Sequence, residues 1–530
     1  MIYYLFRSFV ICWLLFSLLG CDEKETKKIV ILAGEKSHPA TMHEYIKNAR
    51  LIKVMLDGSP DISGLVTEIH GNGWPEDESA LLDADLILTI SDGRDGPNGL
   101  GVPFMTEERM AVLRQAIEAG SGFMTFHYST FAPDRYGEEM LLWSGGYFDW
   151  QNDKGEREWY SDIRFLDQEV SLINPEHPVM HGVMPFQIYE EYYFDLRFRE
   201  ENEGFVPLIE VPGLGSEREW GNVVAWALNR EDGGRGFGTT MGHLYANWKN
   251  EDYRKFLLNA IVWTAGMEVP PGGISSDFYS DREVTGRLYG KDYKALILTG
   301  SDHPAHQWEQ TVPVLKSALE SGGRIHADIS RNINDLFQYD LRDYDFLAFY
   351  YANWEDPDPL WEGSKKALIE YVNSGGSLMF VHFANGAFHE SLPGAEASDW
   401  PEYRKFCRRV WDHSAGSSHD KYGTFEVRIV DKDHELTSGI GNFEVTDELY
   451  YNQAGEEPIH VLMSATSLDT GKEEPLAWVY ELNTPGGRNV RVFQTVLGHD
   501  STTFKVPEFE QVLNRTALWL SRGTERWNEL

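Results

Sequence analysis

Short, uninterrupted runs of apolar residues alternate with longer amphipathic stretches along most of the chain. Residues 29–33 and 86–90 are continuous apolar runs, which is typical of strands buried on both faces of a sheet. Residues 43–56 and 105–120 carry apolar side chains at helical spacing, and residues 123–126 form a further apolar run. Strands and helices that alternate at these lengths predict an α/β domain with a parallel sheet.

The same order of patterns occurs twice in the chain. Matching segments keep their order and lie between 255 and 266 positions apart. The matches are KKIVILAGEKSHP with YKALILTGSDHP, LLDADLILTISDG with LRDYDFLAFYYAN, GSGFMTFHYSTF with GGSLMFVHFANGAF, NPEHPVMHGVMPFQIYEEYYF with DKDHELTSGIGNFEVTDELYY, and GFGTTMGH with VFQTVLGH. This repeat is far longer than the period of solenoid repeats, so it predicts two homologous domains.

We expect the first domain to span residues 28–268 and the second to span residues 292–524. Residues 269–291 between them are rich in proline, glycine and serine, which indicates a linker. A chain of 530 residues with 42% hydrophobic residues has enough length and apolar content for two cores. The formal net charge of -37 argues against nucleic-acid binding, because such a surface repels phosphate backbones. Solubility is the simplest explanation of this acidity.

The N-terminal segment has the pattern of an exported, lipid-anchored protein. Arg7 precedes the apolar residues 9–19, a run shorter than the roughly 20 residues of a membrane-spanning helix. The run leads into Leu-Leu-Gly-Cys, which resembles the bacterial lipoprotein signal, where cleavage leaves Cys21 to carry lipid. We therefore expect residues 1–21 to be a lipoprotein signal peptide. The mature protein would lie in the bacterial cell envelope, periplasmic or otherwise extracytoplasmic; the alternative is a plain membrane anchor.

The cysteines give no basis for disulfide bonds. The chain has three, Cys12, Cys21 and Cys407, and lipidation of Cys21 would leave Cys407 as the thiol of the mature chain. The fold must therefore depend on its cores. Cys407 lies in YRKFCRRVWDH, which has no counterpart in the first domain, and we interpret it as a packing residue.

Histidines follow several of the predicted strands. Ligands of open parallel sheets bind beyond the carboxyl ends of the strands, where an imidazole can transfer a proton near neutral pH or bind a metal ion. We expect these histidines to converge on one pocket in each domain: His38, His127 and His243 in the first, and His303, His382 and His499 in the second. The alternative for any one of them is a hydrogen-bonded structural role.

A pair of acidic residues recurs in the segments IYEEYYF and VTDELYY. Adjacent residues of a strand point to opposite faces, so one carboxylate of each pair can reach the pocket. We expect this residue to be Glu191 in the first domain and Glu448 in the second. It would orient the imidazoles, act as a base or complete a metal site; the alternative is a solvated acidic edge.

At these positions the sequence resembles the ThuA-like family, which is named for trehalose utilisation. The motifs that carry the resemblance are ILAGEKSH with ILTGSDH, NGWP, FMTFH with LMFVH, EEYYF with DELYYN, and MGH with LGH. The resemblance implies two tandem flavodoxin-like domains of the class I glutamine amidotransferase type, each an α/β three-layer sandwich with a mainly parallel sheet. It also implies carbohydrate metabolism, with trehalose-like disaccharides and keto-sugars as substrates.

The chain departs from true glutamine amidotransferases at the nucleophile. Those enzymes need a cysteine on a sharp turn after a strand, and His127 and His382 occupy that place here. We therefore expect no Cys-dependent glutamine hydrolysis. Ser129 lies two residues after His127, but its counterpart is Ala384, so a serine nucleophile has little support.

Two hypotheses of function follow. The first is an enzyme that modifies a glycoside, a trehalose-like disaccharide or a keto-sugar, as a hydrolase, lyase or isomerase, by moving protons next to a carbonyl or at a leaving oxygen. The expected catalytic residues are His127, Glu191 and His243, and His382, Glu448 and His499; the expected substrate-binding residues are His38, His43, His303, His306 and Trp308. The second hypothesis is a non-catalytic carbohydrate-binding or scaffold lipoprotein.

The expected partners are a small carbohydrate and, through the lipid, a membrane; the duplication leaves a homo-oligomer open. A divalent metal such as zinc is an open alternative as cofactor, because histidine and carboxylate suit it. The aromatic residues Tyr128, Trp308, Trp354 and Phe383 are candidates for stacking on sugar rings, and core packing is the alternative for each.

Overall fold

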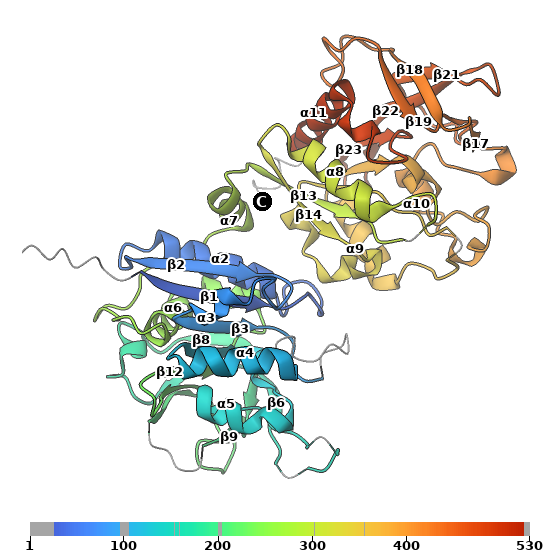
Figure 1. The fold of residues 1–530 in the computed structure, drawn as a ribbon. Helices are drawn as coiled ribbons and strands as arrows, with labels where there is room; N and C mark the ends of the chain where they lie inside the picture. Colours follow the sequence, from blue (N-terminus) through green and yellow to red (C-terminus); the bar gives the residue numbers. More distant parts are fainter. Residues whose placement is uncertain are drawn as a thin grey trace, which may run out of the picture. The chain divides into compact units, whose positions relative to one another are not determined.

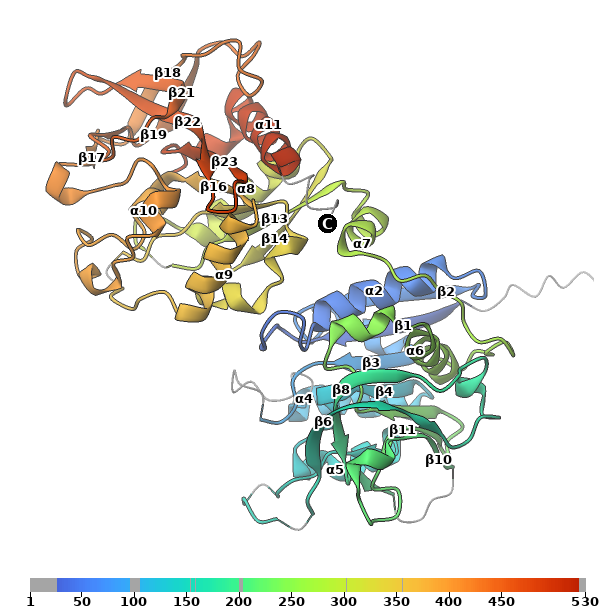
Figure 2. The same cartoon turned by 180° about the vertical axis from the view of Figure 1, so that it is seen from behind.

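A computed structural model describes residues 26–95, 105–152, 154–157, 159–199, 204–301, 303–354 and 356–523. The described residues form two compact units: domain 1 comprises those up to Ser37 and from Met42 to Phe278, and domain 2 comprises His38–Thr41 and those from Tyr279 onward. Figures 1 and 2 show both as α/β structures seen from opposite sides. The expected signal peptide, with Cys21, lies outside the described residues.

The large sheet of domain 1 has the strand order β2-β1-β3-β4-β12-β11-β10-β7 in the described residues. Its first five strands are parallel and the rest antiparallel. Their bounds are β1 Lys27–Ala33, β2 Leu65–His70, β3 Leu86–Ile90, β4 Gly122–Phe126, β7 Ser171–Leu172, β10 Phe205–Glu210, β11 Val223–Asn229 and β12 Arg235–Thr239. The parallel part has the flavodoxin-like order 2-1-3-4-5, which confirms the predicted fold class.

Helices cover both faces of this sheet (Figures 1 and 2). Helices α2 (Tyr45–Gly58) and α6 (Glu251–Thr264) contact one face. Helices α3 (Ser79–Leu82), α4 (Glu107–Glu118) and α5 (Gly137–Trp143) share a buried cluster with side chains of β1, β3 and β4 on the other. Successive side chains of a strand point to opposite faces, so a strand between two helical layers must be apolar at every position. This burial explains the continuous apolar runs of β1 and β3.

Domain 2 repeats this architecture in a sheet of order β14-β13-β15-β16-β23-β22-β21-β18-β19 in the described residues. The first five strands are parallel and the last four antiparallel. Their bounds are β13 Tyr293–Leu298, β14 Ile325–Ser330, β15 Phe346–Phe349, β16 Ser377–Val381, β18 Gly423–Ile429, β19 Phe443–Asp447, β21 His460–Thr466, β22 Glu473–Asn483 and β23 Asn489–Thr495. The two sheets thus agree in the order and direction of their parallel strands.

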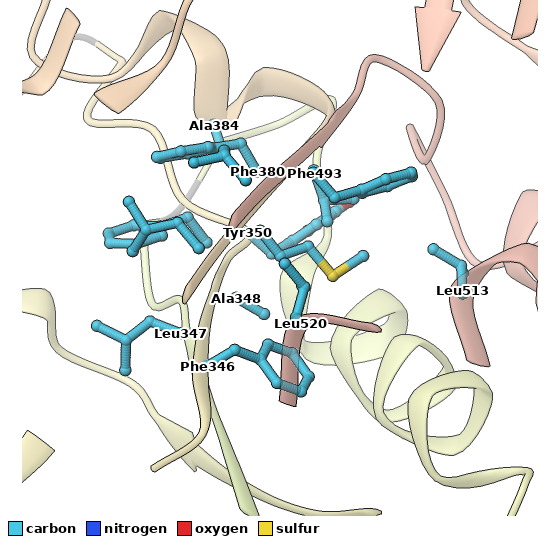
Figure 3. Packing of buried hydrophobic residues seen from close by; sticks show 14 of the residues in the cluster. Phe346, Leu347, Ala348, Tyr350, Phe380, Ala384, Phe493, Leu513 and Leu520 are labelled. Carbon is cyan, nitrogen blue, oxygen red and sulfur yellow. The ribbon is translucent and has the colours of Figure 1, made fainter. Parts of the chain in front are cut away.

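The core of domain 2 lies between its sheet and the surrounding helices, which are α8 (Trp308–Glu320), α9 (Glu362–Asn373), α10 (Tyr403–Phe406) and α11 (Pro507–Gly523). Figure 3 shows part of this core, with Phe346, Phe380 and Phe493 of three adjacent strands and Leu520 of α11 in one cluster. Cys407 is fully buried in the same cluster, as its interpretation as a packing residue requires.

Two antiparallel ribbons extend from the domains and matter for the sites. In domain 1, β6 (Asp162–Glu169) pairs with β8 (Gln187–Phe194) along its whole length. In domain 2, β18 pairs with β19. The remaining short strands are β5 Gly146–Tyr147, β9 Arg197–Phe198, β17 Ser418–His419 and β20 Tyr450–Tyr451.

The stretch expected to be a linker contains a helix, α7 (Asp281–Tyr289), which contacts β13 of domain 2. Ser280 and Glu283 form a capping box at its start, and Gly290 ends it in the left-handed conformation. Across the described part of the chain, no helix is both long enough and apolar enough to cross a membrane.

Candidate active site

Four side chains from distant parts of domain 1 meet in one group. The site-1 group consists of His43, His127, Glu191 and His243, and one nitrogen or oxygen atom of each lies within 4.8 Å of those of the others. His127 follows β4, Glu191 lies on β8, and His243 follows β12. All three histidines are buried. The carboxyl ends of parallel strands, the edge where such folds bind ligands, therefore hold the group.

His127 is placed by a strained backbone turn. Its φ is 51°, in the left-handed region that few residues other than glycine adopt. The turn ends β4 and directs the side chain into the group. Nδ1 lies 2.6 Å from the carbonyl oxygen of Thr240, which can only accept, so Nδ1 donates and Nε2 keeps its lone pair. Nε2 lies 3.3 Å from the hydroxyl of Tyr193 and 3.5 Å from Glu191 Oε2.

Glu191 joins two of the histidines. Its Oε2 lies 2.9 Å from His243 Nδ1, in addition to the contact with His127. Burial opposes ionisation of this carboxyl, but its contacts with His127 and His243 outweigh the effect of burial, so the pKa of Glu191 is lowered. Glu191 is therefore an ionised carboxylate held between two imidazoles.

His43 is oriented by a hydrogen-bonded chain. The Tyr45 hydroxyl donates to Asp92 Oδ1 at 2.5 Å, and Ser37 donates to the same oxygen at 2.6 Å. With its hydrogen directed to Asp92, the Tyr45 oxygen accepts from His43 Nδ1 at 2.9 Å. Nδ1 of His43 is thus the protonated nitrogen, and Nε2 is the one with a lone pair.

The second carboxylate of the acidic pair, Glu190, holds the loop that carries His243. Glu190 is fully buried and accepts hydrogen bonds from the backbone N–H groups of Gly242 and His243 at 3.2 and 3.0 Å, and from Asn247 at 2.8 Å. Burial raises the pKa of Glu190, although the hydrogen bond from Asn247 lowers it. The two adjacent glutamates thus have separate tasks, because they point to opposite faces of β8.

Domain 2 contains the equivalent group. The site-2 group consists of His306, His382, Glu448 and His499, whose ligand atoms also lie within 4.8 Å of one another. His382 has a φ of 52° after β16, and its Nδ1 lies 2.7 Å from the Val496 carbonyl. Glu448 Oε2 lies 3.1 Å from His499 Nδ1 and 3.8 Å from His382 Nε2. The Tyr450 hydroxyl lies 2.9 Å from His382 Nε2, as Tyr193 does beside His127.

The site-2 group brings two nitrogen lone pairs face to face. His303 Nδ1 accepts from the Ala305 N–H at 3.1 Å, so His306 Nδ1 must donate to it across their 3.2 Å contact. His382 Nδ1 donates to a carbonyl. Both Nε2 atoms therefore carry lone pairs, yet they lie 3.2 Å apart. A proton or a cation between them would relieve this repulsion.

Protonation of these two imidazoles is opposed by their surroundings. Burial and the neighbouring histidines lower the pKa of His306, and burial lowers the pKa of His382 to about 3. At His499 burial acts in the same direction, but the hydrogen bond and charge of Glu448 outweigh it and raise the pKa. The group thus combines two imidazoles whose protonation burial opposes with a third, His499, whose protonation Glu448 favours.

Asp447 has in domain 2 the role that Glu190 has in domain 1. It is fully buried, and it accepts from the N–H groups of Gly498 and His499 at 2.7 and 3.2 Å and from Thr503 at 2.7 Å. Burial raises its pKa to about 6. The shorter aspartate reaches the same loop, so the support of the last histidine is preserved although the residue type differs.

All eight residues of the two groups were expected, six as catalytic residues and His43 and His306 as substrate-binding residues. The third histidine of each group, however, differs from the strand-end residue proposed. It is His43, where His38 was expected, and His306, where His303 was expected. His38 lies in the short segment His38–Thr41. The loop after the first strand places His43, because Met42 forms a bridge with Leu244 and the His43 N–H donates to the His243 carbonyl; His43 itself has a φ of 48°. His303 contacts His306 through the Nδ1 atoms of the two rings.

Tyr193, Tyr450 and the clamping roles of Glu190 and Asp447 were missed. The duplication held a signal for them, since each pair is 257 positions apart, like Glu191 and Glu448. Trp308 is partly buried against the core of domain 2 at the start of α8. Among the other aromatic candidates, the Phe383 ring lies 4.3 Å from that of His306, and the Tyr128 ring lies 5.3 Å from that of His43.

The donor atoms of both groups suit a divalent metal ion. Three imidazoles and one carboxylate match the ligands of zinc, and bonds of about 2.0–2.1 Å in a tetrahedral site put neighbouring donors about 3.3 Å apart. Separations of 2.9 to 3.8 Å between donor atoms within the two groups lie around that value. Carbonyl and tyrosine partners fix the outer nitrogens, as is usual for metal-binding histidines. Nε2 of buried His243 has no hydrogen-bond partner in the described residues.

Comparisons with known proteins agree with the duplication. A family model described as trehalose utilisation, ThuA, matches residues 32–264 and again residues 294–520. A search of curated proteins found no match.

Solved structures with similarity include ThuA-like proteins. One from Parabacteroides merdae is 26% identical, with 44% of this chain and 90% of that chain covered and a TM-score of 0.37. One from Bacteroides uniformis is 17% identical, with 43% and 91% covered and a TM-score of 0.32. A glutamine amidotransferase from Thermotoga maritima is 10% identical, with 45% and 92% covered and a TM-score of 0.24.

The family matches cover most of the chain and fall one in each domain. The name of the family connects it with the use of a disaccharide, and hence with carbohydrate metabolism. On this evidence the chain belongs to the ThuA, or trehalose utilisation, family, of which it carries two tandem copies.

Proposed function

We propose that the protein is an enzyme of carbohydrate metabolism that transfers protons on a glycoside, a trehalose-like disaccharide or a keto-sugar. One observation carries the proposal: a buried group of three histidines and one glutamate is built twice in the chain, at the same strand ends and with the same supports. A structural role for one buried histidine is common, but a duplicated group with a shared carboxylate fits acid–base chemistry better.

Glu191 and His243 are the reacting pair in site 1. They lie on the more accessible side of the group, with side-chain exposures of 15% and 6%, against 2% for His127. Glu191 is ionised and 2.9 Å from His243 Nδ1, so it orients the imidazole to take a proton from a carbon next to a carbonyl, or to give one to a leaving oxygen. Glu448 and His499 have the same relation in site 2.

The deeper residues hold the substrate's oxygen atoms. The hydroxyls of Tyr193 and Tyr450 lie beside His127 and His382, and burial raises the pKa of both phenols, so they stay protonated and able to donate. Negative charge that develops on a carbonyl oxygen during proton abstraction would be stabilised by such donors. The surrounding burial excludes water, which strengthens these interactions.

Substitution of His127 and His382 by asparagine, together in one chain, tests the proposal. Purified wild type and the double variant would be assayed with trehalose-like disaccharides, other glycosides and their keto forms, while binding is measured by calorimetry. We expect turnover of at least one of these sugars by the wild type and its loss in the double variant. Sugar binding without turnover in the wild type would instead support a non-catalytic carbohydrate-binding or scaffold protein.

As the alternative to direct proton transfer by the histidine–glutamate pair, we propose that each group holds one divalent ion, with zinc as the first candidate. The support is the donor set, the spacing of the donor atoms and the two facing lone pairs of His306 and His382. When bound, such an ion would polarise a carbonyl or hydroxyl oxygen of the sugar. His43, His127, Glu191 and His243 would hold it in site 1, and His306, His382, Glu448 and His499 in site 2.

Tyr45→Phe is expected to weaken metal binding in site 1 alone by about 10–100-fold. The variant removes the hydroxyl that orients His43 through its Nδ1. Equilibrium dialysis with zinc would measure the effect. Tyr253→Phe is the matched control, because Tyr253 is a buried tyrosine of the same domain whose hydroxyl has no hydrogen-bond partner in the described residues. Equal affinities of both variants and the wild type would contradict the assigned role of Tyr45.

The proposed location is the bacterial cell envelope, with the chain anchored through lipid on Cys21. The support is the apolar run of residues 9–19 followed by Leu-Leu-Gly-Cys. Expression of the full chain in bacteria fed a labelled fatty acid tests it. We expect label in the wild type and none in Cys21→Ser. Label that persists in this variant would contradict the assignment.

A further inference from the structure

Two aromatic side chains lie exposed beside site 1. Phe165 of β6 is 42% exposed and Tyr189 of β8 is 51% exposed, although both carry large apolar rings. Their rings stack, with centroids 5.8 Å apart and planes at 28°. The pair forms a small apolar platform on the surface of the β6–β8 ribbon.

The platform adjoins the reacting pair of site 1. The Phe165 ring lies 5.2 Å from the ring of His243 and perpendicular to it. Phe165 is directly opposite Glu191 in the ribbon, and opposite residues share a face. Tyr189 precedes Glu191 by two positions on β8, so it shares this face and lies about 7 Å along the strand.

The backbone of Tyr189 and the backbone of His243 are held by the same pair of side chains, Asn247 and Glu190. Asn247 donates from its Nδ2 to the Tyr189 carbonyl at 3.0 Å and to Glu190 Oε2 at 2.8 Å. Glu190 in turn holds the His243 backbone. Asp167 lies opposite Tyr189 in the ribbon and is exposed, so a carboxylate flanks the platform.

Domain 2 keeps half of this arrangement. Gly423 pairs with Asp447 in the β18–β19 ribbon, which makes Tyr422 the counterpart of Phe165 opposite Glu448. The Tyr422 ring lies 5.3 Å from the His499 ring, and its hydroxyl donates to Asp500 at 2.7 Å. The counterpart of Tyr189, however, is Thr446, 257 positions later. Site 2 therefore has one ring against its last histidine and lacks the stacked second ring.

We propose that the Phe165–Tyr189 platform is a sugar-stacking subsite, which binds the second pyranose ring of a disaccharide or glycoside whose reacting ring lies in site 1. This inference rests on the proposed function, of which it narrows the substrate class. The carbon–hydrogen face of a pyranose is apolar and packs against aromatic rings, while its rim of hydroxyls can donate to a carboxylate such as Asp167.

The dimensions favour this occupant. A ring on Tyr189 would lie one sugar unit away from Glu191, because two strand residues span about 7 Å. A glycosidic bond between the two rings would then fall near His243 and Glu191. Site 2, with Thr446 in place of the second ring, is expected to discriminate less between a disaccharide and its monosaccharide.

Titration calorimetry of the full chain with trehalose and with glucose tests the subsite. Phe165→Ala and Tyr189→Ala are each expected to weaken trehalose binding about 3- to 10-fold, as loss of an aromatic contact implies, and to leave glucose binding unchanged. Tyr189→Phe keeps the ring and should retain the affinity for trehalose. Trp361→Ala removes a 55%-exposed aromatic of domain 2 and is the matched control.

Unchanged trehalose affinity in both alanine variants would overturn the subsite, and so would equal losses for trehalose and glucose, or no trehalose binding by the wild type. Thermal unfolding of each variant shows whether the domain is intact. We expect it to be intact, because substitutions at exposed positions on a ribbon change stability little. If trehalose binding depends on the two rings but no sugar is turned over, the catalytic function is contradicted and the subsite is supported. If a sugar is turned over but trehalose binding does not depend on the rings, the subsite is contradicted and the catalytic function is supported.

Discussion

Replacement of Glu191 and Glu448 together by glutamine is expected to lower sugar turnover by about 10²–10⁴-fold, the usual contribution of general acid–base catalysis. Glutamine has nearly the same shape, but it cannot hold a negative charge between two imidazoles. Glu191 contacts His127 and His243, and Glu448 contacts His382 and His499, so each change removes the carboxylate that pairs with the reacting histidine. Initial rates at saturating and at low sugar concentration would measure the loss.

The single variants locate the activity. If both sites react, each single substitution should remove part of the rate, and if one site reacts, one substitution should remove nearly all of it. Glu169→Gln with Glu426→Gln is the matched control, since these glutamates are exposed, lie on β6 and β18, and are also 257 positions apart. A double variant of Glu191 and Glu448 that keeps the wild-type rate would exclude acid–base catalysis by these groups.

The fold was predictable because strands that are buried on both faces need continuous apolar runs, and such runs are visible in the sequence. Strands β1 and β3 lie between two helical layers, so both faces must be apolar, and their runs are continuous. The strand and helix alternation then indicates a parallel sheet. The antiparallel extension of each sheet was harder to predict, since short strands such as Ser171–Leu172 have no distinct periodicity.

The site was predictable where it lies directly at a strand end. His127 and His382 follow β4 and β16 without a gap, so the rule for ligands of parallel sheets applies to them. His43 was placed less well, because a loop with two left-handed residues, Thr41 and His43, lies between β1 and α2. The conformation of such a loop depends on contacts distant in sequence, which local patterns do not contain.

The comparison of the two domains separates what the site needs from what can vary. Both domains keep the glutamate, the tyrosine beside the strand-end histidine and a buried carboxylate under the last histidine. They differ in the residues that orient the third histidine. In domain 1, Tyr45 and Asp92 orient His43. In domain 2, another histidine, His303, orients His306. The geometry of the four-residue group is thus shared, whereas the residues that orient its third histidine differ between the domains.

Each domain is expected to bind one equivalent of zinc, so the chain should take up two. His127→Ala should reduce the uptake to one equivalent, and His127→Ala with His382→Ala should abolish it, because each change removes a central donor from one group. Equilibrium dialysis followed by elemental analysis measures these stoichiometries. Zinc at 100 times its Kd should stabilise a domain by about 2.7 kcal/mol, so a chelator should lower the unfolding temperature of the wild type.

His460→Ala is the control for this experiment. His460 is a half-exposed histidine of domain 2, with a side-chain exposure of 53%, and it pairs with Asp431 outside both groups. It should keep two equivalents and the full effect of the chelator. Two equivalents retained by the double variant would place the metal elsewhere. No uptake by the wild type would exclude the ion, and the facing lone pairs of His306 and His382 would then have to share a proton despite the lowered pKa of each.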